Sequence, residues 1–207
     1  MKETARLIFV ELKEHLPFTI FSACLAMIAI GFATVITKDA ELPGLGENLF
    51  HIFHPLHILA SAATTTSMYW KYKKNIILSI IIGAAGSIVI CSLSDIIFPF
   101  FGGRMLSIDM HFHICIINHP VIIIPFLAVG IAMGFFSPKI IEHSTIYSHS
   151  AHILLSTMAS LVYLISFGMV NWMQHIGYVF MLLIFVVLIP CCISDIAFPL
   201  FFVKNRS

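Results

Sequence analysis

Two aspartates are the residues of this sequence with the clearest potential for chemistry. Asp95 and Asp195 are the only acidic residues inside long uncharged stretches, and each occurs in a Ser-Asp-Ile-x-Phe-Pro motif. An ionisable side chain in such a stretch is costly, so it indicates a functional site. The motif predicts a carboxylate one turn before the proline that ends its helix, where the helix dipole favours a nearby cation. Since no lysine or arginine lies in these stretches, the partner is a proton, a protonated histidine or a metal ion.

Histidines and cysteines surround these aspartates in a duplicated pattern. A His-x-x-His pair projects two imidazoles from one helix face, and a cysteine four residues before each aspartate shares a face with that carboxylate. Two imidazoles one turn apart and a carboxylate from a neighbouring helix form a ligand set typical of transition metals. The two sets are His54, His57, Cys91 and Asp95, and His149, His152, Cys191 and Asp195.

We therefore predict two metal sites near opposite faces of a membrane. This donor chemistry favours a divalent transition-metal ion, above all zinc or ferrous iron, over magnesium or calcium. A single histidine at a helix start is equally well explained as a snorkelling residue, so the interpretation depends on the duplication. The outer site is predicted from His54, His57, Asp95 and His119, with Cys91 a turn deeper, and the inner site from His149, His152, Asp195 and His15, with Cys191 deeper.

The composition indicates which elements position these residues. Of the 207 residues, 59% are hydrophobic and only 10% are charged, whereas a soluble domain has roughly 25% charged residues. We expect an all-α integral membrane protein whose main partner is the lipid bilayer, with no role in nucleic-acid binding because the formal net charge is only +1. Six transmembrane helices are predicted, at about 16–37, 52–70, 76–98, 119–137, 148–170 and 176–200.

The distribution of positive charge predicts the orientation. With the N-terminus inside, the inner segments contain nine of the eleven Lys and Arg residues, and the outer segments contain only Lys38 and Arg104. The positive-inside rule then gives an N-in, C-in topology. The corresponding location is the cytoplasmic (inner) membrane of a prokaryote, and a six-helix bundle of this size is also a candidate for forming a homodimer.

The chain reads as two repeats of three helices, at 1–103 and 104–207. The Ser-Asp-Ile-x-Phe-Pro ending and the His-x-x-His opening recur in the same order, and the first spans of the two units agree more weakly. Because each unit has an odd number of spans, the second is inserted upside down relative to the first. Such inverted-topology repeats are common among secondary transporters.

These patterns favour a secondary, proton-coupled membrane transporter for a divalent transition-metal ion. The alternative is a metal-dependent integral membrane enzyme with one or two His/Asp sites, although two matched sites favour it less. A bis-histidine haem carrier would need histidines on facing helices, whereas these pairs share one helix. The sequence contains neither a G-x-x-x-x-G-K-[ST] loop for ATP nor an H-E-x-x-H protease motif.

Small and hydroxyl residues suggest how the helices meet. Gly83 and Gly86 permit close approach of neighbouring helices. Hydroxyls at 64–67 and at 156–160 have two interpretations, a hydrated path between the sites or hydrogen bonds to carbonyls of their own helix. The remaining histidines lie in loops or at loop edges, where His111 and His113 beside Asp109 are a weaker candidate for collecting metal outside.

Overall fold

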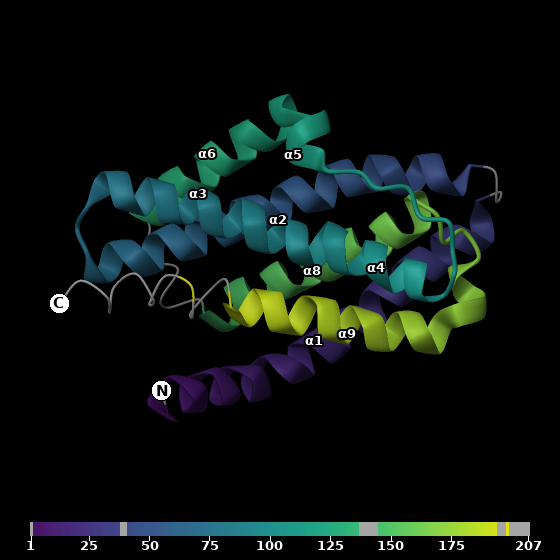
Figure 1. Cartoon of the computed structure of the whole chain (residues 1–207), viewed down its shortest axis with the longest axis horizontal. Helices are drawn as coiled ribbons and strands as arrows, with labels where there is room; N and C mark the ends of the chain where they lie inside the picture. Colours follow the sequence, from purple (N-terminus) through teal and green to yellow (C-terminus); the bar gives the residue numbers. More distant parts are fainter. Residues whose placement is uncertain (1, 38–40, 137–144, 194–197, 199–207) are drawn as a thin grey trace.

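The chain is described here from a computed structural model, which places residues 2–37, 41–136, 145–193 and 198. All regular secondary structure in these residues is helical, as the sequence predicts, and Figure 1 shows the helices as one elongated bundle. The elements are α1 (Lys2–Ile36), α2 (Leu42–Tyr72), α3 (Ile76–Ser92), the π-helical turn η1 (Leu93–Ile97), α4 (Phe98–Met105), α5 (Cys115–Asn118), α6 (Pro120–Phe136), α8 (Thr145–Ser166), the 3-10 turn η2 (Trp172–His175) and α9 (Ile176–Cys192).

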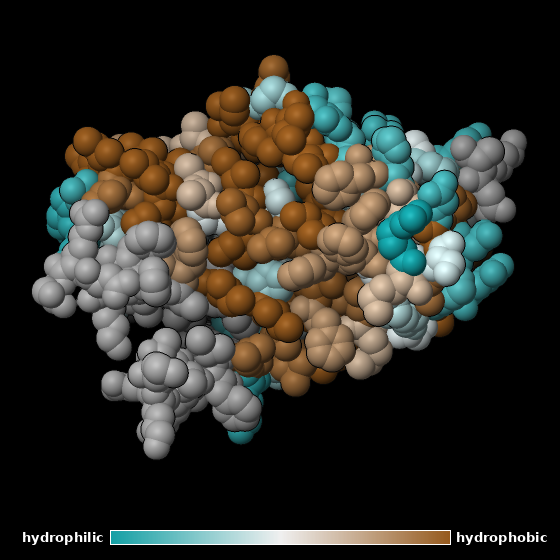
Figure 2. Space-filling view, in the orientation of Figure 1, coloured by the Kyte–Doolittle hydropathy of each residue, from teal (hydrophilic) through white to brown (hydrophobic). Residues whose placement is uncertain are grey.

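Three helical segments of the described chain are long and apolar enough to cross a membrane. They are His15–Ile36, Ile76–Met105 and Trp172–Cys191, and two shorter apolar helices cover Pro120–Phe136 and Ser150–Ser166. Large apolar side chains face outward, and hydrophobic residues cover most of the middle of the face seen in Figure 2. Such a broad apolar surface is unusual for a soluble protein and supports membrane association.

Helix α2 lies at the centre of the bundle and carries more buried polar residues than any other described helix. It packs against α3, α6 and α8, while α1 packs against α8 and α9. Glycines allow the close approach: a Cβ on Gly83 would overlap the Thr66 hydroxyl, and one on Gly130 would overlap the carbonyl oxygen of Leu59. The small-residue stretch at 83–86 therefore acts in helix packing, as the sequence predicts.

Gly130 provides a test of this packing. We expect Gly130→Ala to lower the free energy of unfolding by about 1–3 kcal/mol, because the added methyl group overlaps backbone that cannot move aside. Gly177→Ala is the matched control, since nothing lies within 4 Å of a Cβ at that helical position. Thermal unfolding in detergent measures both variants, and equal midpoints for the two would contradict the close α2–α6 contact.

Three helices extend well beyond their predicted ends, and the first of them, α1, begins at Lys2 rather than near residue 16. Helix α2 begins at Leu42 rather than near residue 52, and the helix that begins at Ile76 continues past Pro99 to Met105. His57 is consequently the central residue of α2, and Cys91 lies at the middle of the segment Ile76–Met105. At a rise of about 1.5 Å per residue, His57 is roughly 22 Å from either end of α2. His57 and Cys91 therefore lie near the middle of their helical segments rather than near the ends.

Candidate metal centre

Asp95 is the hub of a buried hydrogen-bond network. Its Oδ2 atom accepts from Nδ1 of His54 at 2.9 Å and from Nδ1 of His57 at 2.7 Å. Its Oδ1 atom accepts from the hydroxyls of Ser94 at 2.7 Å and Ser156 at 3.0 Å. The carboxylate is completely buried, and four donors compensate for its removal from solvent.

A π-helical turn places Asp95 in this position. Pro99 has no N–H group and would clash with a carbonyl in a regular α-helix. At η1 the helical turn contains one additional residue instead. The N–H of Phe98 therefore donates to the carbonyl of Leu93, five residues earlier. Asp95 therefore lies inside a continuous helix and not at a helix end, contrary to the sequence-based expectation. π-Helical turns of this kind are frequent at functional sites.

The hydrogen bonds to Asp95 determine which nitrogen of His57 is available to a metal. Since a carboxylate can only accept, the Nδ1 atom of His57 carries a proton, and Nε2 is the atom that can offer a lone pair. Nε2 of His57 lies 2.7 Å from Nε2 of His152, on α8. The Sγ atom of Cys91 lies 3.7 Å from the same Nε2 atom, so a thiol approaches the pair of imidazoles.

His57, His152 and Cys191 form a buried group, which we call the central site, that could hold a metal ion. Their ligand atoms lie within 4.8 Å of one another, so a common centre is no more than about 2.8 Å from each, close to the roughly 2.0–2.3 Å of zinc–ligand bonds. Cys91 is the candidate fourth ligand because its thiol is next to His57. Two imidazoles with one or two thiolates form a donor set suited to zinc or iron.

The structure combines residues that the sequence assigned to two separate sites. His57, Cys91 and Asp95 of the first predicted set lie beside His152 and Cys191 of the second. The difference in depth follows from the longer helices, which carry the first set to the middle of the bundle. His15 is buried in α1, while Asp195 and the side chain of His149 lie outside the described residues.

The contacts of Asp95 favour a role other than the predicted one of metal ligand. Both of its oxygens are already occupied by imidazole and hydroxyl donors. A carboxylate that accepts from the second nitrogen of a ligating histidine orients the ring and increases its basicity. The geometry therefore makes Asp95 an orienting residue for His57. His54 shares this acceptor, but its ring stacks on Phe50 at a centroid distance of 5.1 Å.

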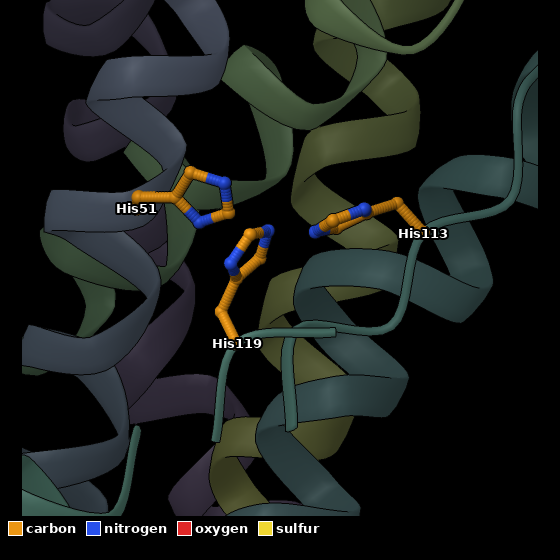
Figure 3. Close-up of side chains that lie close together, drawn as sticks. All are labelled: His51, His113 and His119. Atoms are coloured by element: carbon orange, nitrogen blue, oxygen red, sulfur yellow. The ribbon is translucent and has the colours of Figure 1, made fainter. Parts of the chain in front are cut away.

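His119 belongs to a different group from the one that the sequence predicts. It lies with His51 and His113, whose ligand atoms are also within 4.8 Å of one another, and Figure 3 shows the three rings converging. His119 immediately precedes α6, which places it away from the deeply buried Asp95. We call these three residues the histidine triad. In the sequence, the position of His51 three residues before His54 is the signal that could have indicated the histidine triad.

Burial affects the ionisable groups around the triad. The pKa of His113 is lowered mainly by burial and further by the neighbouring imidazoles of His51 and His119. Burial also raises the pKa of the Cys115 thiol to about 11. The neutral imidazole, which is the form that binds metal, is thus favoured at His113, while Cys115 remains a thiol.

Several hydroxyls in the bundle bond to their own helices. Thr64 donates to the carbonyl of Ala60 at 3.0 Å, and Thr157 donates to that of Ile153 at 2.7 Å. Ser160 likewise donates to the carbonyl of Ser156 at 2.8 Å. These contacts agree with the second interpretation of the hydroxyl-rich stretches, in which they satisfy backbone carbonyls.

Comparison with known proteins gives no family for this chain. No protein-family model matches it, and neither a curated protein nor a solved structure shows significant similarity to it. Its function is therefore inferred from its own residues and their geometry.

Proposed function

We propose that this protein is a secondary membrane transporter that carries a divalent transition-metal ion, zinc or ferrous iron, through the central site in exchange for protons. The observation that supports this most directly is the contact between His57 and His152 at 2.7 Å. These histidines are the second members of the two His-x-x-His motifs, so equivalent residues of the two halves meet at the centre of α2.

The helix packing supports the proposed architecture of six spans in two inverted three-helix repeats. The first helix of each proposed repeat packs against the second helix of the other, since α1 contacts α8 and α6 contacts α2. Successive long helices also alternate in direction along the bundle in Figure 1. Such reciprocal contacts between the two proposed repeats are expected when a pseudo-two-fold axis in the membrane plane relates them. We retain the N-in, C-in orientation in the cytoplasmic membrane from the charge distribution.

The position of the site also supports transport. Substrate sites of secondary transporters typically lie near the bilayer midplane, between the repeats and beside an interrupted helix. The central site lies halfway along α2, contains residues from both halves of the chain, and adjoins the π-helical turn that carries Asp95. A site at this depth can be opened toward either face by a modest rocking of the two halves.

The contact between the two imidazoles provides a mechanism for proton coupling. A hydrogen bond between the Nε2 atoms of His57 and His152 requires one of them to carry a proton. Both lone pairs can face one metal ion only after that proton has left Nε2, either for solvent or for the second nitrogen of the His152 ring, and thiol ligands release their protons to solvent when they bind zinc. Metal and protons therefore compete for the same atoms, so opposite movement of the two conserves charge in the apolar interior.

The proposal is tested in proteoliposomes loaded with a zinc indicator and, separately, with a pH indicator. We expect protein-dependent Zn²⁺ entry accompanied by proton exit, and a loss of at least about tenfold in rate for His152→Ala because one of the proposed ligands is missing. His175→Ala is the control, since His175 is an exposed histidine outside both groups. Zinc binding without any zinc flux would contradict transport and favour the metal-dependent enzyme.

A further inference from the structure

The histidine triad lies at a different depth from the central site. His51 is six residues before His57 on the same helix, which corresponds to about 9 Å along its axis. His113 and His119 come from the chain between α4 and α6. The ring centroids are 4.6 Å apart for His51 and His119, 5.4 Å for His113 and His119, and 5.5 Å for His51 and His113.

An unsatisfied nitrogen points into this triad. His113 is only 6% exposed, and its buried Nε2 atom has no hydrogen-bond partner among the residues that the structure describes. Figure 3 shows this outer ring nitrogen directed toward His51 and His119. A buried polar atom without a partner destabilises the fold, and a metal ion held by all three imidazoles would remove that cost.

Polar groups next to the triad could orient its imidazoles and supply negative charge. The amide nitrogen Nδ2 of Asn118 lies 2.9 Å from Nδ1 of His113. A 180° rotation of this amide exchanges its nitrogen and oxygen, and the oxygen would then accept the Nδ1 proton and leave Nε2 for the metal. The Glu47 carboxylate lies 3.8 Å from Nε2 of His51 and supplies negative charge. The half-buried position of His51 and His119 gives an ion access from outside the core.

We propose that His51, His113 and His119 bind a second divalent transition-metal ion, with an open coordination position for water. Three ligand atoms within 4.8 Å of one another need only small ring rotations to reach a common ion, and three imidazoles plus water form a familiar tetrahedral arrangement for zinc. The triad lacks thiolate ligands, so its ion differs in chemistry from an ion at the central site. Binding here is a property of the triad alone and does not require transport.

An aromatic cluster packs against the triad and against His54. The Phe50 ring is completely buried, and its centroid lies 5.7 Å from that of His51, 5.1 Å from that of His54 and 6.2 Å from that of His113. Tyr163 and Phe167 pack on the same ring, at 5.4 and 5.7 Å. Apolar rings thus pack against the triad and against His54 of the Asp95 network, and we expect the loss of one ion to leave the other site occupied.

Cobalt titration of the purified full-length protein distinguishes the two sites. Co²⁺ replaces Zn²⁺ in such sites, and only a thiolate ligand gives a sulfur-to-cobalt charge-transfer band. We expect about two Co²⁺ ions per chain, with His119→Ala losing one ion and keeping that band. His57→Ala should lose the band and keep one ion. His175→Ala should bind both ions and serves as the control, since His175 is exposed and lies in neither group.

Misfolding of one variant is addressed with a second substitution in the triad. His51→Gln keeps a polar side chain of similar size, and its expected loss is again one ion with the charge-transfer band intact. The proposal is overturned if both triad variants bind as many ions as the unaltered chain, or if the unaltered chain binds only the thiolate-ligated ion. Absence of zinc flux in proteoliposomes would overturn the transport proposal but would leave these ion counts unchanged.

Discussion

His57→Ala should abolish metal binding at the central site, with a loss of affinity of more than ~100-fold. His57 supplies the Nε2 atom that faces both His152 and Cys91, at 2.7 and 3.7 Å. Removing a ligand should exceed the roughly 10–100-fold effect that is typical of losing an outer-shell partner. Isothermal titration with Zn²⁺ measures the loss directly. Zinc at 100 times its dissociation constant should stabilise the unaltered protein by about 2.7 kcal/mol, and the central-site contribution should disappear.

His54→Ala is the matched control for this experiment. His54 lies on the same helix, is equally buried and donates to the same Asp95 oxygen, but it is not part of the central site. We expect its removal to weaken zinc binding much less than His57→Ala. If the two variants lost equal affinity, the central site as described here would be wrong, and the predicted pairing of His54 with His57 as joint ligands would be favoured.

Asp95→Asn should lower metal affinity at the central site by about 10–100-fold, because a neutral amide increases the basicity of a ligating imidazole less than a carboxylate does. The amide has nearly the same shape, and the Ser94 and Ser156 hydroxyls can accept as well as donate, so folding should persist. With Co²⁺, the sulfur-to-cobalt band should still develop, but at higher metal concentration. This combination is the signature of an orienting residue rather than of a ligand.

The control for this second variant is Asp109→Asn. Asp109 is exposed and pairs with Arg104 at 3.0 Å, and exposed pairs contribute only about 0–1 kcal/mol. We expect its zinc affinity to be unchanged. A loss for Asp95→Asn as large as that for His57→Ala would instead show that Asp95 is itself a ligand, as the sequence suggested.

The sequence predicts where helices occur better than where they begin and end. Each of the six predicted stretches contains a described helix, because long uncharged runs leave few alternatives. The structure begins α2 at Leu42, ten residues before the predicted start, because the prediction followed an uncharged stretch and Glu47 lies outside it. In the structure Pro43 lies in the first helical turn, and Gly46 lies against Ser166 of α8, where a Cβ would overlap the hydroxyl. These residue types allow a helix to start and to pack closely as readily as they form a loop.

The site residues were predicted more reliably than their grouping. His57, Cys91, Asp95, His152 and Cys191 were all candidates, and the structure brings them together. Their grouping depends on how far along the bundle each residue lies. Because a π-helical turn accommodates Pro99, the helix continues to Met105, and Cys91 and Asp95 do not lie at its end. The histidine triad depends on the path of the chain between α4 and α6, and hydrophobic periodicity carries no information about such a connection.

The pairing of His57 with His152 has a consequence for the history of such a chain. Each half contributes one histidine and one cysteine to the neighbourhood of the central site, so neither half contains a complete set of ligands. A three-helix ancestor could have assembled the same site only by associating with a second copy inserted in the opposite orientation. Fusion of two such copies would make the antiparallel arrangement permanent, and selection on metal choice would then act on both halves together.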